Sequence, residues 1–90
     1  MIVNKVIVMQ RLDSGDENYV SVKANDRPFS SKDKIYLESN ILKLIPSLED
    51  TLYFTIRLTK NSKKSNWKCK TIKEVQDILE EIFSGVDEVD

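Results

Sequence analysis

Apolar and polar residues alternate strictly from residue 51 to residue 59. The apolar positions are Leu52, Phe54, Ile56 and Leu58, and the positions between them hold threonine, tyrosine or arginine. A period of two over this length is typical of a β-strand with one buried face and one face near water. A helix would scatter the same four side chains around its circumference, because its period is 3.6 residues. The chain is therefore predicted to fold around a sheet that is covered on one side only.

The composition of the 90-residue chain fits one small globular domain, with 40% hydrophobic and 32% charged residues. We expect a single domain over residues 1–90, with its core at about residues 2–85 and a frayed acidic tail at 86–90. No apolar run approaches the roughly 20 residues that span a bilayer, so no membrane association is expected. One cysteine, and usage rich in lysine, isoleucine and asparagine, favour a cytoplasmic protein from a bacterium or a phage.

Before the strand predicted at residues 51–59, the pattern predicts two more strands, over residues 2–12 and 18–24, joined by a turn around Gly15. Ser30 or Ser31 then caps a helix that runs to about residue 45, before Pro46. A short strand at residues 35–37 followed by a helix from Ser39 is the alternative. The apolar stripe of the predicted helix consists of Leu37, Ile41, Leu44, Ile45 and Leu48.

Downstream, residues 60–65 are predicted to form a polar loop and residues 66–70 a short fourth strand. Thr71 and Glu74 have the spacing of a capping box, in which the glutamate would accept a hydrogen bond from the amide of residue 71. A second amphipathic helix follows. The predicted fold class is α+β, a two-layer ββαββα arrangement. Its four-stranded antiparallel sheet has the order 2-1-3-4, with two helices on one face.

The residue types that are missing argue against catalysis. The chain has no histidine, so it lacks the usual general base at neutral pH and the commonest metal ligand. Its two glycines lie far apart, so there is no phosphate-binding loop, and no acidic spacing matches a calcium loop. Cys69 is expected to be a small buried hydrophobe, although Lys68 and Lys70 flank it. We expect no enzyme activity, no cofactor and no metal.

If the helices cover Phe54 and Ile56, the opposite face of the sheet is open. Trp67 shares a face with Cys69, so it is expected in the core rather than on that open face. The open face then carries six cations, two tyrosines, an apolar centre with Ile7 and Met9, and no carboxylate. Its candidate binding residues are Lys5, Arg11, Tyr19, Lys23, Tyr53, Arg57, Lys68 and Lys70.

Charge is also segregated along the chain. Residues 57–73 hold seven basic residues and no acidic one, and residues 74–90 hold seven acidic residues and no basic one. On the last predicted helix the carboxylates form an acidic stripe of Glu74, Asp77, Glu80 and Glu81. This stripe could dock on a basic groove of a partner. Ordinary solvation is the alternative explanation for both the stripe and the open face.

Three functional hypotheses follow, and no motif is specific enough to indicate a family. The leading one is a non-enzymatic module that binds a protein partner, as an adaptor or as a small inhibitor. On the evidence of the acidic stripe, the target would be an enzyme that handles nucleic acid. The alternative is nucleic-acid binding through the open face. The third is a homodimer formed through Ile7, Met9 and Tyr53.

Overall fold

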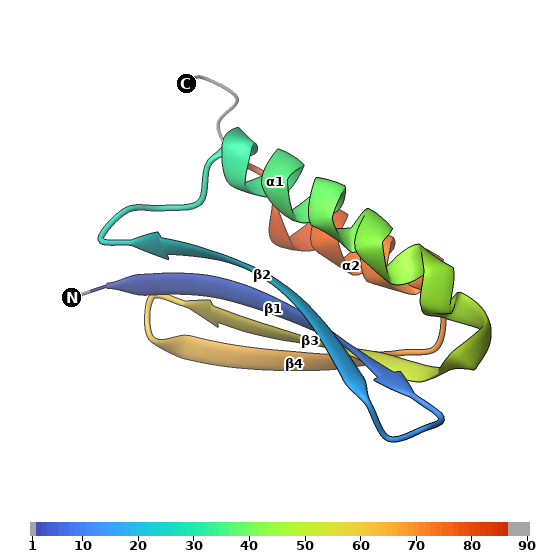
Figure 1. Cartoon of the computed structure of the whole chain (residues 1–90). Coiled ribbons are helices and arrows are strands. Elements are labelled where there is room, and N and C mark those ends of the chain that lie inside the picture. Colours follow the sequence, from blue (N-terminus) through green and yellow to red (C-terminus); the bar gives the residue numbers. More distant parts are fainter. Residues whose placement is uncertain (1, 87–90) are drawn as a thin grey trace.

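The computed structural model describes residues 2–86, and its strands and α-helices follow the predicted order (Figure 1). The four strands form one antiparallel sheet in the order 2-1-3-4, as predicted. Both α-helices lie on the same side of this sheet (Figure 1), which confirms the α+β fold. The elements are β1 (Val3–Leu12), β2 (Glu17–Asn25), α1 (Ser31–Ile41), the 3₁₀ helix η1 (Leu42–Asp50), β3 (Thr51–Lys60), β4 (Lys63–Cys69) and α2 (Ile72–Ile82).

The alternation along each strand decides which side chains the helices cover. Val8 lies across from Val20 on one side and from Ile56 on the other, and all three are buried. Each fully buried aliphatic side chain contributes about 1.5–3 kcal/mol. The helices complete this core with Leu37 and Ile41 from α1, Leu44 from η1, and Val75, Leu79 and Ile82 from α2.

The first helix is shorter as an α-helix than predicted. It begins after Ser30, ends at Ile41 and continues as the 3₁₀ helix η1 to Asp50, with Pro46 inside the 3₁₀ segment. A 3₁₀ helix has three residues per turn instead of 3.6, so the apolar stripe shifts around the axis. Leu44 therefore stays buried, whereas Ile45, predicted to belong to the buried stripe, is exposed.

A β-bulge near the start of β3 leaves one residue of that strand without a partner. Arg11 pairs with Tyr53 and Leu12 pairs with Thr51, so Leu52 has no partner on β1. An extra residue in one strand breaks the regular alternation at that point. The prediction that Leu52 faces the helices is therefore wrong, and its side chain is 58% exposed. Phe54 and Ile56 are buried as predicted.

The fourth strand begins earlier than predicted, because residues 60–65 do not form a loop. Asn61 and Ser62 both have positive φ, and Lys60 pairs directly with Lys63. Two central residues with positive φ make a turn whose twist matches that of a two-stranded hairpin. This two-residue turn adds Lys63, Lys64 and Ser65 to β4, and the strand ends at Cys69.

Two buried amides on β1 attach the ends of the sheet to the neighbouring connections. Asn4 donates to the carbonyl oxygen of Arg27 at 2.7 Å and accepts from the amide of Asn61 at 3.1 Å. Gln10 donates to the carbonyl oxygen of Leu44 at 2.9 Å and to Thr51 at 2.8 Å. Buried amides are costly unless they are hydrogen-bonded, so these contacts favour one position of the connections relative to β1.

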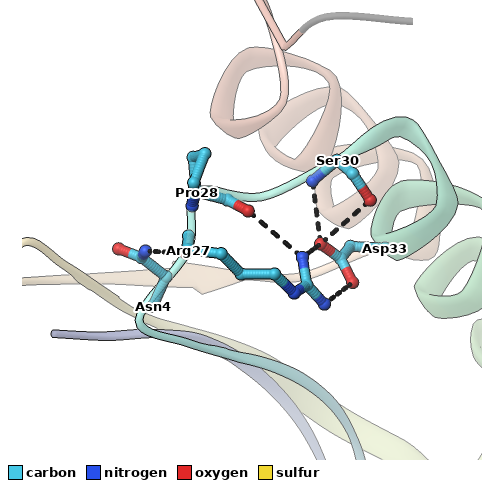
Figure 2. Close-up of polar contacts among 5 residues, drawn as sticks. All are labelled: Asn4, Arg27, Pro28, Ser30 and Asp33. Carbon is cyan, nitrogen blue, oxygen red and sulfur yellow. Dashed lines mark hydrogen bonds and ion pairs between the residues drawn. The ribbon is translucent and has the colours of Figure 1, made fainter. Parts of the chain in front are cut away.

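An ion pair closes the connection from β2 to α1 (Figure 2). The guanidinium group of Arg27 donates to both carboxylate oxygens of Asp33, at 2.8 and 3.0 Å. The same carboxylate accepts from the amide of Ser30 at 2.8 Å, as an N3 residue does in a capping box. Asp33 is buried, and hydrogen bonds from Arg27 and Ser30 lower its pKa despite the opposing effect of burial.

The second helix starts with a cap close to the predicted one. The Thr71 hydroxyl accepts from the amide of Glu74 at 3.2 Å. The Glu74 carboxylate accepts from the amide of Lys70 at 3.0 Å, rather than from that of Thr71 as predicted. Val86, predicted to belong to a frayed tail, packs against the core, and residues 87–90 of that predicted tail lie outside the described residues.

Replacing Leu37 by alanine should lower the free energy of unfolding by about 2–5 kcal/mol, because a buried leucine is lost and a cavity remains. Leu37 is fully buried, whereas Leu42, five residues further on, is 59% exposed. Leu42→Ala should therefore change stability by less than about 0.5 kcal/mol. Urea denaturation followed by Trp67 fluorescence measures both. Equal losses in the two variants would contradict the packing described above.

The Asp33 carboxylate should make stability depend on acid. Because its pKa lies below the ordinary 3.8, its ionised form stabilises the folded state above that value. This contribution is lost as the pH falls through the lowered pKa. At neutral pH, Asp33→Asn should thus have a free energy of unfolding about 1–3 kcal/mol lower than wild type, and this difference should shrink as the pH falls through the lowered pKa. Glu49→Gln, at an exposed carboxylate of η1, is the control and should change the free energy of unfolding at neutral pH by less than about 0.5 kcal/mol. A gap that does not change with pH would contradict this role for Asp33.

Candidate functional site

The face of the sheet opposite the helices is the candidate site, here called the open face. Its side chains come from alternate positions of all four strands, and cross-strand pairing places them in four rows. The rows are Lys23–Lys5–Thr59–Lys64, then Ser21–Ile7–Arg57–Asn66, then Tyr19–Met9–Thr55–Lys68, and last Glu17–Arg11–Tyr53.

The open face is hollowed rather than flat. A depression with a volume of about 800 Å³ is lined by residues of all four strands. Its floor is apolar, since Ile7 and Met9 of the central strand β1 lie in it and are only half-buried. This side has no covering segment among residues 2–86 (Figure 1). The open face is thus a hollowed surface with an apolar floor.

The open face is strongly cationic although the chain as a whole is slightly acidic. Six cations lie on it, together with one carboxylate, so the face has a net charge of +5. The whole chain has a net charge of −1, which leaves −6 for the rest of the molecule. The cations are Lys5, Arg11, Lys23, Arg57, Lys64 and Lys68.

The carboxylate on this face corrects the prediction that it carries none. β2 begins at Glu17, one residue before the predicted start, and Glu17 pairs with Arg11 across the hairpin. Its carboxylate forms a salt bridge of 2.7 Å with the Arg11 guanidinium group. It is also hydrogen-bonded to the hydroxyl group of Tyr19, which raises the pKa of Tyr19. The positive charge of Arg11 is thus balanced within the protein.

A second internal contact involves the other tyrosine. The Lys68 ammonium group lies over the ring of Tyr53, 4.3 Å from its centroid. This is a cation–π interaction, and it occupies one face of the ring. Lys68 and Arg11 therefore both have partners, whereas Lys5 and Lys23 face each other across the β1–β2 pair.

Seven of the eight predicted open-face residues come together on this surface: Lys5, Arg11, Tyr19, Lys23, Tyr53, Arg57 and Lys68. Lys70 does not, because β4 ends at Cys69 and Lys70 leads into the cap of α2. Sequence reasoning missed Glu17, Lys64 and Asn66. The signal for the last two was Asn61-Ser62, since a two-residue turn there extends β4 back to Lys63.

The predicted acidic stripe is exposed along α2, but most of it has partners within the protein. Asp77 forms a salt bridge with Lys73 at 3.3 Å, one turn earlier on the same helix. Glu80 forms one with Lys34 of α1 at 3.0 Å. Glu74 serves the helix cap, and Glu81 is exposed. The stripe thus carries less uncompensated charge than its four carboxylates suggest.

The residues considered for chemistry or stacking, Cys69 and Trp67, differ in how far they are covered. Cys69 is buried, and burial together with the nearby Glu74 raises the pKa of its thiol, which disfavours the reactive thiolate. Trp67 is half-buried: it pairs with Ile56 and packs against the core, as predicted, but it also lines the hollow of the open face, where it was not expected. Within residues 2–86, no group of histidine, cysteine and acidic side chains could hold a metal ion.

Comparison with known proteins adds no identification. No family model, curated protein or solved structure gives a significant match to the chain. Over the described part of the chain, neither α-helix has the length and apolar character needed to cross a membrane.

The contact between Glu17 and Tyr19 can be tested by titration. Because the Glu17 carboxylate raises the pKa of Tyr19, Glu17→Gln should lower that pKa toward the ordinary 10.0. The pKa can be followed by NMR of ¹³C-labelled tyrosine. Asp16→Asn, in the adjacent turn, should leave the titration of Tyr19 unchanged. An unaltered Tyr19 pKa in Glu17→Gln would show that the two side chains do not interact in solution.

Proposed function

We propose that the protein is a non-enzymatic binding module whose open face holds an acidic surface of a protein partner. The observation that carries this proposal is the segregation of charge, with +5 on one hollowed sheet face of a chain whose total is −1. Electrostatic complementarity of this kind steers association and selects partners of opposite charge. An adaptor or a small inhibitor fits a module of this size.

The chemistry of the chain supports a binding role over an enzymatic one. The sequence has no histidine, and its one cysteine is buried with a raised pKa. The hollow on the open face has an apolar floor at Ile7 and Met9, with charges around it. An apolar centre with a polar rim is the usual anatomy of a protein–protein interface.

Three features favour a protein partner over nucleic acid. Single-stranded nucleic acid is usually held by aromatic rings on which bases stack. Here Lys68 covers one face of the Tyr53 ring, and the central strand β1 contributes Ile7 and Met9 to the hollow rather than aromatic rings. Glu17 also places a carboxylate where phosphates would approach. Finally, the sequence pI of about 5.5 is far from the basic values typical of nucleic-acid-binding domains.

Nucleic acid remains the second candidate, since six cations and two tyrosines share the open face. The homodimer through Ile7, Met9 and Tyr53 would use the same surface. The inhibitor hypothesis that rests on the acidic stripe has less support, because Asp77 and Glu80 already pair with lysines. We therefore base the proposal on the open face alone.

The proposal is tested by comparing what wild type and two charge-reversal variants capture from a lysate of the source organism. Arg57→Glu with Lys64→Glu alters the open face, and Lys32→Glu with Lys43→Glu makes the same charge change on the helical side. We expect an acidic protein captured by wild type and by the helical-side variant, with capture by the open-face variant reduced about tenfold or more. Nuclease treatment should not change the result.

Two outcomes would contradict the proposal. Capture that disappears after nuclease treatment would indicate nucleic acid as the true ligand. Equal capture by both variants would place the binding surface elsewhere. Light scattering on the purified protein tests the third hypothesis, because a dimer that dissociates in the open-face variant would show that a second copy occupies this surface.

A further inference from the structure

We infer that the open face has two chemically different ends and that its occupant is an extended acidic peptide segment. The carboxylates of the segment would bind at the lysine end, and an apolar or aromatic residue would bind at the tyrosine end. This inference rests on the proposed function and adds the chemistry and the orientation of the partner.

The lysine end is the row that contains Lys5, Lys23 and Lys64. Lys5 and Lys23 are directly opposite each other, an arrangement that destabilises a sheet because like charges repel. The next row adds Arg57, and neither of these two rows contains a carboxylate. Four cations thus lie together without an acidic neighbour on this part of the sheet, as expected of a surface that receives anions from outside.

The tyrosine end has the opposite arrangement, because its cations already have partners. Arg11 is held by Glu17, and Lys68 lies over the Tyr53 ring. What remains accessible is apolar and aromatic, namely Met9, half-buried, and Tyr19, exposed beside it. An anion gains little here, since Glu17 would repel it, whereas an apolar side chain can cover Met9 and the rings.

The distance between the two ends sets the spacing in the partner. Lys5 and Met9 are four residues apart on β1, which corresponds to about 13 Å along a strand. Ile7 lies between them and supplies an apolar floor. A segment in extended conformation covers this distance in about four residues. The occupant should therefore carry clustered carboxylates and, about four residues away, one large apolar side chain.

The test uses three labelled peptides and fluorescence anisotropy on the 90-residue protein. The first has three glutamates, then three serines, then one tryptophan. In the second, serine replaces the tryptophan, and in the third, glutamine replaces the glutamates. A single-stranded oligothymidylate of equal length serves as the nucleic-acid probe. We expect the first peptide to bind at low salt, the second more weakly and the third least.

Protein variants separate the two ends. Lys5→Glu, Lys23→Glu and Lys64→Glu together should weaken binding of the first peptide by about tenfold or more and reduce its salt dependence. The same three lysines changed to glutamine give a milder variant if the reversal impairs folding. Lys32→Glu, Lys43→Glu and Lys60→Glu together form the matched control and should bind as wild type. Met9→Ser should weaken binding of the first peptide about threefold to tenfold and leave binding of the second peptide unchanged.

The outcomes distinguish this inference from the proposed function. If the first and second peptides bind equally, or if Met9→Ser affects both alike, the two-ended inference is wrong while an acidic partner still fits. If no acidic peptide binds, or if the oligothymidylate binds more tightly than the first peptide, the proposed function fails as well.

Discussion

The burial of one sheet face by two helices is the constraint on which the rest of the structure depends. The helices α1 and α2 pack on one side of the sheet (Figure 1). The strand side chains on that side are removed from water, among them Val6, Val8, Phe54 and Ile56. Because side chains alternate along a strand, every residue between these positions must point to the other side. The open face is thus a direct consequence of how the core is formed. Its composition is then free to vary, and in this chain it is cationic.

The polar contacts keep that arrangement in place without using the cations of the lysine end. Asn4 and Gln10 on β1 bind backbone oxygens of the connections, and Arg27 with Asp33 closes the start of α1 (Figure 2). All of these groups lie toward the covered side or at the ends of the sheet. The hydrogen bonds and ion pairs named here therefore do not use the lysines of the lysine end. This supports our proposal that these lysines bind an external ligand.

The strict alternation made the sheet, its covered positions and most of the open face predictable from sequence. What it could not supply depends on pairing between strands. The bulge that exposes Leu52 arises from its register against β1, and no local pattern marks it. The place of Glu17 on the open face depends on the register of the β1–β2 hairpin, which pairs it with Arg11. The sequence pattern alone does not fix the start of β2 to within one residue. The start of β4 was recoverable, because asparagine tolerates the positive φ that Asn61 adopts in the turn. Lys64 joined the open face as a result.

Thiol reactivity along β1 tests most directly whether this face is uncovered. In a Cys69→Ala background, single cysteines would replace Val6, Ile7, Val8 and Met9, and their rates with a thiol reagent would be compared below the denaturation midpoint. The structure predicts fast reaction at positions 7 and 9 and strong protection at positions 6 and 8. Equal protection at all four positions would show that another segment or another copy covers the open face, and this would contradict the account.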